Sequence, residues 1–295
     1  MRLRSDGTSS GAEPDPVIPD RSSISRLPLW PTIRRSYASY VVGFGAILRI
    51  AWPWLVLCAL LPAPAMALRM AGLFGPAGTT AITIIAQLVV FLAGFSIAVA
   101  WHRHLILDQA AAPSLGNVLT SHLWRFAAVA VLIGLMAWLP MWLPILLSGL
   151  LPDPSFVGSM TQGELIALAL PALLVRLVIF ALLYRLCLAM PASAINADGL
   201  GLSASWSATR GNLLRLMLCA AACMLLPGAM LGHVQAMIYR AILIPDSGFA
   251  LPSTRTLVLL QGATNVVQLL IVPLAASFLS IAYLHLAPAR DNASG

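Results

Sequence analysis

Six long apolar stretches constrain the fold of this chain most strongly; they cover residues 51–72, 80–104, 124–150, 164–190, 212–238 and 256–286. A helix needs about 20 mostly apolar residues to cross a bilayer, and each stretch reaches that length. Apolar residues make up 60% of the 295 residues and charged residues only 9%, too few to cover a water-soluble surface. The sequence therefore predicts an all-α integral membrane bundle with six transmembrane helices.

The arginines predict the orientation of this bundle. All 17 basic residues are arginine, and most lie at helix ends on the side of the N-terminus, whereas Arg69, Arg240 and Arg255 lie on the other side. Because positive residues are retained in the cytoplasm, both termini are expected to be cytoplasmic in a bacterial inner membrane. The expected domains are a disordered cytoplasmic tail at 1–29, a six-helix transmembrane domain at 30–289 and a short cytoplasmic tail at 290–295.

Segments 33–48, 113–126 and 201–216, which precede the first, third and fifth stretches, carry apolar residues at helical spacing. This pattern predicts three short amphipathic helices that lie in the cytoplasmic interface. Each segment contains or leads into an apolar–Arg–apolar step, at Arg49, Arg125 and Arg215. We interpret the three units as a threefold repeat of interfacial helix, helix out and helix back. The alternative is that any six-helix protein with both ends inside places arginines at these positions.

Three segments carry a family resemblance: "ILRIAWPWLVL", "VAWHRHLILDQ" and "LSASWSATRGNLLRL". Here the chain resembles a group of uncharacterised inner-membrane proteins from alphaproteobacteria. More distantly, it is similar to the six-helix membrane domain of some bacterial glycerophosphodiester phosphodiesterases. The resemblance covers about residues 30 to 290 and implies an architecture only. The catalytic barrel of those phosphodiesterases is a separate soluble domain, so the resemblance transfers no catalytic residue.

Few residues are available for chemistry inside the membrane. The chain has ten acidic residues, and none lies deep in an apolar stretch, which argues against a proton relay or a sodium site. His102, His104 and His122 allow a three-histidine metal site, but we favour contacts with lipid phosphates. Cys219 and Cys223 share a helix face and are interpreted as buried side chains. We expect no catalytic residue, no cofactor and no metal. A protein that is not an enzyme is favoured over an enzyme, which stays open as the third alternative.

A basic and aromatic rim is predicted at the cytoplasmic helix ends. Tryptophan and arginine both favour the membrane–water interface, where arginine also attracts anionic lipid. The rim is a hypothetical binding site for lipid headgroups formed by Arg49, Arg103, Arg125, Arg185, Arg215, Trp52 and Trp101. The alternative is general anchoring in anionic lipid.

Arg176 lies near the middle of the fourth stretch, where an arginine costs about 2.5–3.5 kcal/mol to insert. It is therefore expected to face the bundle interior. The sixth stretch supplies a polar stripe there, because Gln261, Asn265 and Gln268 lie at i, i+4 and i+7. Further candidates to join this polar stripe are Gln87, His233 and Gln235. These groups either hold the helices together or, with Arg176, form a site for an anion.

The sequence thus favours a non-enzymatic inner-membrane protein that binds, moves or organises lipid or an amphipathic anion. The alternative function is a membrane scaffold or an accessory subunit of a larger complex. Membrane lipids are the expected partners, and a protein partner or a second copy of the chain stays open. Nucleic acid is not expected, because the arginines form no basic patch interleaved with aromatic residues.

Overall fold

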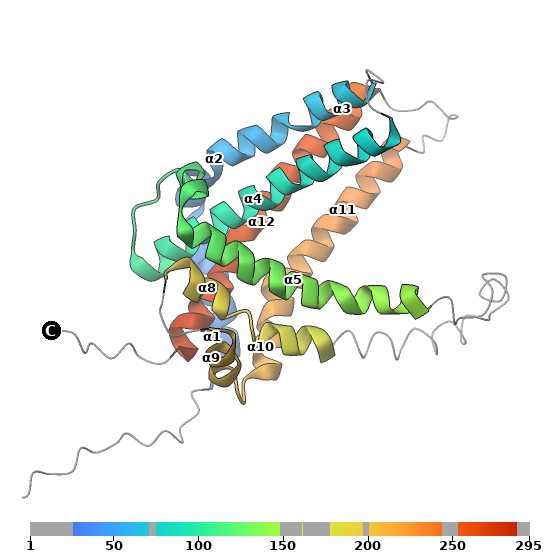
Figure 1. The fold of residues 1–295 in the computed structure, drawn as a ribbon. Coiled ribbons are helices and arrows are strands. Elements are labelled where there is room, and N and C mark those ends of the chain that lie inside the picture. Colours follow the sequence, from blue (N-terminus) through green and yellow to red (C-terminus); the bar gives the residue numbers. More distant parts are fainter. Residues whose placement is uncertain are drawn as a thin grey trace, which may run out of the picture.

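The computed structural model describes residues 26–70, 75–147, 161, 178–196, 201–243 and 253–287, and their regular structure is entirely helical. In chain order, the first half of the chain forms α1 (Leu29–Val42), α2 (Phe44–Leu60), α3 (Pro62–Met70), α4 (Pro76–Leu107), the 3-10 helix η1 (Ser114–Leu119) and α5 (Ser121–Leu147). The later helices are α8 (Ala189–Ala194), α9 (Leu202–Ala208), α10 (Leu213–Ala220), the π-helical segment η3 (Ala221–Leu225), α11 (Leu226–Leu243) and α12 (Thr254–Leu286). Figure 1 shows their arrangement.

Four helical segments are long and apolar enough to cross a membrane: Phe44–Arg69, Pro76–Leu107, Leu213–Ala241 and Thr254–Leu286. They coincide with the first, second, fifth and sixth predicted stretches. The third stretch falls largely on α5, of which the part with described side chains is the shorter apolar helix Ser121–Ala137. Residues 164–177 of the fourth stretch lie outside the described residues, as do residues 1–25 of the first predicted tail and the whole second tail at 290–295. The last part of the first tail, 26–29, is described, and Leu27 in it is buried. The described part of the chain is therefore all-helical and contains four candidate membrane spans.

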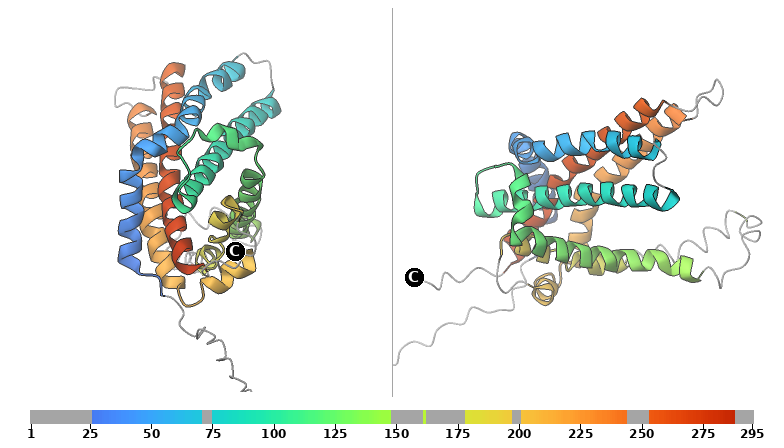
Figure 2. Two further views of the ribbon diagram at one scale, coloured as in Figure 1. Left: turned by 90° about the vertical axis from the view of Figure 1, so that its left-hand side faces the viewer. Right: turned by 45° about the horizontal axis from the view of Figure 1, so that its top comes forward.

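Helix α12 is the central element, since it packs against α1, α2 and α4 (Figure 2). The α4–α12 contact contains two buried polar pairs. Trp101 Nε1 donates to Ser277 Oγ over 2.8 Å, and His102 Nδ1 lies 2.7 Å from Ser280 Oγ. At the C-terminal end of α12, a ring nitrogen of His285 lies 3.2 Å from the carbonyl oxygen of Arg26. The first and last described segments thus meet at one end of the bundle.

Helix α1 differs from the predicted interfacial helix in its position. It runs alongside α12 as far as the middle of that helix, where Tyr40 donates its hydroxyl to the Leu270 carbonyl over 3.1 Å (Figure 2). Tyr37 donates to the Ala222 carbonyl in η3 over 2.8 Å. Ile33, Tyr37 and Tyr40 of the predicted apolar stripe therefore pack against neighbouring helices, whereas Val41, Phe44 and Leu48 are exposed. A helix that lies in a membrane interface and a helix that packs against other helices have the same amphipathic pattern. The pattern shows that one face is apolar, but it does not show whether lipid or protein covers that face.

The local structure at the starts of the three proposed repeat units is unequal. The first is the 14-residue helix α1, the second the six-residue 3-10 helix η1, and the third the seven-residue helix α9. Short helices are what the prediction required, but the three differ in length and in helix type. A threefold repeat stays a prediction from the sequence.

Candidate anion-binding cavity

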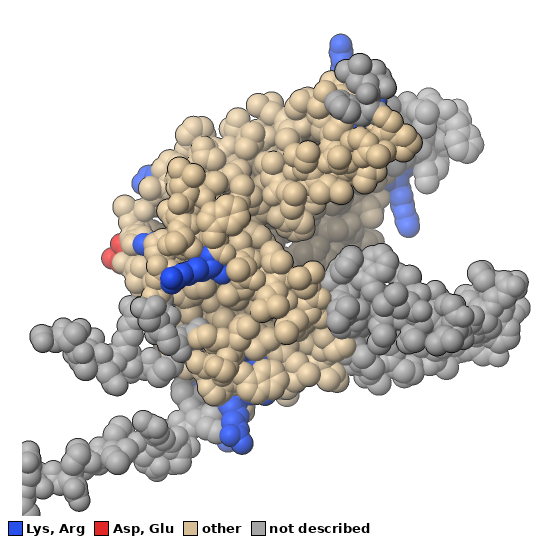
Figure 3. Space-filling view, in the orientation of Figure 1, with Lys and Arg blue, Asp and Glu red and all other residues tan. Residues whose placement is uncertain are grey.

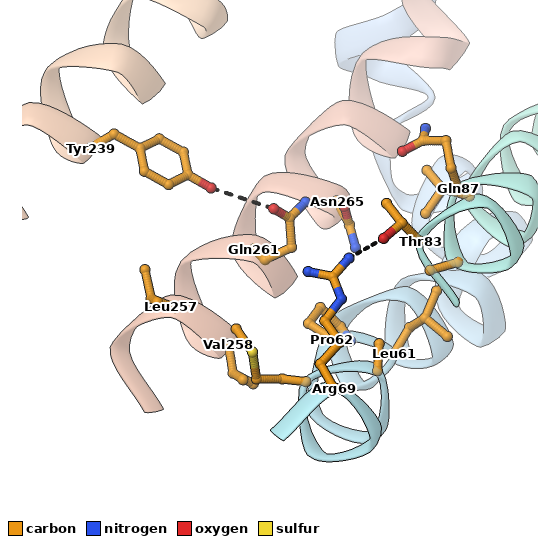
Figure 4. Close-up of a pocket in the computed structure, with 14 residues that line it drawn as sticks. Leu61, Pro62, Arg69, Thr83, Gln87, Tyr239, Leu257, Val258, Gln261 and Asn265 are labelled. Atoms are coloured by element: carbon orange, nitrogen blue, oxygen red, sulfur yellow. Dashed lines mark hydrogen bonds between the residues drawn. The ribbon is translucent and has the colours of Figure 1, made fainter. Parts of the chain in front are cut away.

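A cavity of about 370 Å³ opens between α3, α4, α11 and α12 (Figure 4). It lies at the end of the bundle remote from the chain termini, because its α12 residues belong to the first turns of that helix. Polar side chains come from all four helices. They are Arg69, Thr83, Gln87, Tyr239, Gln261 and Asn265.

Arg69 supplies the positive charge of this cavity. It occupies the last turn of α3, where a cation interacts favourably with the helix dipole. Its Nη2 donates to the Thr83 hydroxyl, and that hydroxyl donates to the Thr79 carbonyl over 2.9 Å. The bond to Thr83 directs the guanidinium across the mouth of the cavity, toward the carboxamides of Gln261 and Asn265 (Figure 4).

The position of Asn265 follows from a proline on another helix. Pro62 has no N–H, so the Cys58 carbonyl four residues before it has no helical donor. Asn265 Nδ2 donates to that carbonyl over 3.0 Å. Gly262 permits the close approach, because a Cβ at this position would lie 2.5 Å from the Ala59 carbonyl oxygen. The junction of α2 and α3 at Pro62 and the polar stripe of α12 therefore fit each other.

Gln261 and Tyr239 continue the hydrogen-bond network that begins at Asn265. Gln261 Nε2 donates to Asn265 Oδ1 over 3.1 Å, and the Tyr239 hydroxyl donates to Gln261 Oε1 over 3.4 Å. These bonds use one N–H of each carboxamide, so each keeps a second N–H. With the remaining guanidinium N–H groups of Arg69, the cavity is rich in hydrogen-bond donors.

The described part of the chain offers Arg69 no carboxylate. Its one acidic residue is Asp108, which follows the opposite end of α4. Most of the surface in Figure 3 is neutral, and arginines are scattered over it. A donor-rich cationic cavity that lacks a described counter-charge is suited to an anion.

The predicted site and the observed cavity overlap in part. Gln261 and Asn265 line the cavity, as does Gln87, whereas Gln268 faces an adjoining apolar groove. Arg176 lies outside the described residues. Sequence reasoning missed Arg69, although its position inside the first predicted stretch was an available signal.

The rim arginines fall into two groups. Three of them donate to backbone carbonyls of other segments: Arg103 to Ala194, Arg185 to Trp206 and Arg215 to Leu27, over 3.2, 2.6 and 2.9 Å. Arg185 also lies 3.7 Å from the Trp206 ring centroid. These three side chains hold segments of the protein together.

Arg49 and Arg125 are exposed and are not among the side chains with a described hydrogen bond. Trp52, 54% exposed, also remains available to lipid. Trp101 was wrongly placed on the rim: it is 0% exposed and bonded to Ser277 inside the bundle. Its indole faces α12 because Gly43 leaves room for the ring, which would lie 2.6 Å from a Cβ there.

The histidines and cysteines do not gather into a metal site in the described residues, where no group of three or more His, Cys, Asp or Glu could hold an ion. His104 Nδ1 lies 2.6 Å from the Gln109 carbonyl oxygen, and His102 is bonded to Ser280. Cys219 and Cys223 are buried free thiols, and so are the other two cysteines.

Comparison with known proteins found no match: no family model, no curated protein and no solved structure is similar to the chain.

Proposed function

We propose that the protein binds the anionic group of a lipid or of another amphipathic anion in the Arg69 cavity, and that it moves or organises this molecule without catalysing a reaction. The observation that carries the proposal is the guanidinium of Arg69 among amide donors, with no carboxylate in the described lining. Hydrogen bonds between a guanidinium and an anion are charge-assisted and stronger than neutral ones, which supports an anionic ligand at Arg69.

The membrane setting belongs to the same proposal. We place the protein in a bacterial inner membrane with six spans and with both termini in the cytoplasm. The contact between Arg26 and His285 supports termini on one side, and the arginine distribution supports the cytoplasmic side. Arg69 then lies at the periplasmic end, at a depth that phospholipid headgroups reach.

Native mass spectrometry in mild detergent tests the proposal, with phosphatidylglycerol and phosphatidylcholine as probes. We expect phosphatidylglycerol to bind the wild type, and Arg69→Gln to weaken that binding about tenfold or more, since hydrogen bonds to charged groups are the strong ones. Arg255→Gln is the matched control, because Arg255 is an exposed arginine at the same end that does not line the cavity. Equal binding by all three proteins would rule out Arg69 as the site.

The same measurement on Arg176→Leu distinguishes the two arginines. Loss of phosphatidylglycerol in Arg176→Leu, together with full binding by Arg69→Gln, would place the anion at the mid-membrane site that the sequence predicts. The expected result is the reverse.

The second candidate function, a scaffold or accessory subunit, is favoured by the exposed Arg49 and Arg125. Neither is tied to the protein by a described hydrogen bond, so both are available to a partner. Co-purification of one defined protein, lost in an Arg49→Gln/Arg125→Gln variant, would support this function.

A further inference from the structure

An apolar groove of about 290 Å³ adjoins the polar cavity and shares Gln87 and Val90 with it. It runs between α4 and α12, with walls that include Gly94, Val272 and Leu279. From Gln87 to His102 it follows α4 for 15 residues, about 22 Å at 1.5 Å per residue. This length exceeds one leaflet of the hydrocarbon core, which is about 15 Å thick.

His102 is the polar group at the inner end of this groove. It is 1% exposed, and its ring packs against Phe126 with 5.8 Å between ring centroids. Nδ1 is held by Ser280 Oγ, whereas Nε2 has no hydrogen-bond partner. A buried nitrogen without a partner costs free energy, so its presence in a groove wall calls for a ligand group or a water.

The hydrogen bond at Nδ1 restricts which group fits Nε2. In a neutral imidazole one nitrogen carries the proton and the other accepts. If Nδ1–H donates to Ser280, Nε2 needs a donor; if Ser280 donates to Nδ1, Nε2–H needs an acceptor. A hydroxyl serves both cases, whereas a carbonyl or an ether serves only the second.

We propose that the groove binds a lipid alcohol, a mainly apolar molecule whose single hydroxyl bonds to His102 Nε2 and whose chain lies between α4 and α12. The depth fits this orientation. His102 lies five residues, about 7.5 Å, from the end of α4 at Leu107. The hydroxyl is thus near the membrane surface and the chain points toward the bilayer centre, as in a membrane leaflet. This site is independent of the anion at Arg69.

Photolabelling of the full chain in phosphatidylcholine nanodiscs tests the proposal. The probe is a hexadecanol with a diazirine in its chain, and labelled peptides are identified by mass spectrometry. We expect label on α4 and α12. Unlabelled hexadecanol should compete about fivefold better than its methyl ether, the difference expected for one hydrogen bond. Equal competition by the two, or no label on these helices, would overturn the proposal.

Three variants complete the test. Gly94→Leu should abolish the label, because an added Cβ already touches Val272 at 3.8 Å and the further carbons enter the groove. Gly232→Leu should keep it, since a Cβ there meets nothing within 4 Å. His102→Phe should lose the preference for alcohol over ether, and a retained preference would remove His102 from the site. If His102→Phe does not fold, the comparison of alcohol with ether in the wild type still decides.

Arg69→Gln separates the two sites. We expect it to bind the hexadecanol probe like the wild type while it loses phosphatidylglycerol. Loss of both ligands in Arg69→Gln would show that the groove has no site of its own and would overturn the proposal.

Discussion

At the end of the bundle that carries the chain termini, Arg103, Arg185 and Arg215 each donate to a backbone carbonyl of another segment. At the opposite end, the described bond of Arg69 goes to a threonine hydroxyl, and its guanidinium faces a cavity. At the end with many arginines, these three thus hold segments of the protein together. At the other end, the Arg69 guanidinium points toward the carboxamides of the cavity (Figure 4). The number of arginines at one end of the bundle therefore does not indicate where a cationic cavity lies.

Arg185→Ala is expected to give the largest change in stability. It removes the bonds to the Trp206 carbonyl and the Thr209 hydroxyl, and the contact with the Trp206 ring. We expect the free energy of unfolding to fall by about 2 kcal/mol, a sum of charged hydrogen bonds and a cation–π contact. Thermal denaturation in detergent measures this, with Arg210→Ala, an exposed arginine next to Thr209, as the control. An unchanged Tm would mean that these contacts of Arg185 contribute little to stability.

Asn265→Leu is expected to have the next largest effect. It leaves the Cys58 carbonyl without a donor inside the bundle and frees Gln261. The free energy of unfolding should fall by about 1 kcal/mol, within the range of interhelical hydrogen bonds in membranes. Gln268→Leu, on the same stripe but exposed, should change it by less. Similar Tm values for the two variants would contradict the structural role given to Asn265.

Arg69→Lys tests whether charge alone defines the cavity end. Lysine keeps the charge but loses the planar fork that bonds Thr83 and an anion together. We expect phosphatidylglycerol binding to weaken about fivefold, or about 1 kcal/mol, by titration in native mass spectrometry. If Arg69→Lys binds phosphatidylglycerol as tightly as the wild type, the positive charge alone would account for binding, and the guanidinium geometry would not be needed.

Arg125→Gln should have the smallest effect on folding, below about 0.5 kcal/mol, because Arg125 is exposed. Its loss should instead weaken adsorption to vesicles that contain phosphatidylglycerol. Flotation of proteoliposomes at low and high salt would detect the weaker adsorption. A large drop in Tm would instead show that Arg125 stabilises the fold, as Arg103, Arg185 and Arg215 do.

Sequence reasoning succeeded where a pattern lies within one helix. Four predicted stretches match candidate spans, and the spacing of Gln261 and Asn265 placed both on the face that lines the cavity. These features depend on length, hydropathy and the 3.6-residue period, which the sequence contains directly.

It failed where the answer depends on which helices pack together. Trp52 and Trp101 have the same expected preference for a membrane boundary, yet only Trp101 is enclosed, by α12 and the gap at Gly43. In the sequence Arg69 served only as an orientation signal. Its polar neighbours in the cavity lie on other helices, 14 to 196 residues away along the chain. Such neighbours follow from tertiary packing, which a single sequence does not display.

The bond between Asn265 and the Cys58 carbonyl also has a consequence for biosynthesis. The partners are 207 residues apart, so at 5–20 residues per second the ribosome reaches Asn265 roughly 10–40 s after Cys58. During that delay the Cys58 carbonyl, which Pro62 leaves without its helical donor, also lacks the Asn265 donor. The first hairpin therefore needs water or the insertion machinery to solvate this carbonyl until the last helix arrives. Because α12 is synthesised last among the described helices, its packing against α2 is the step that supplies the Asn265 donor to this carbonyl.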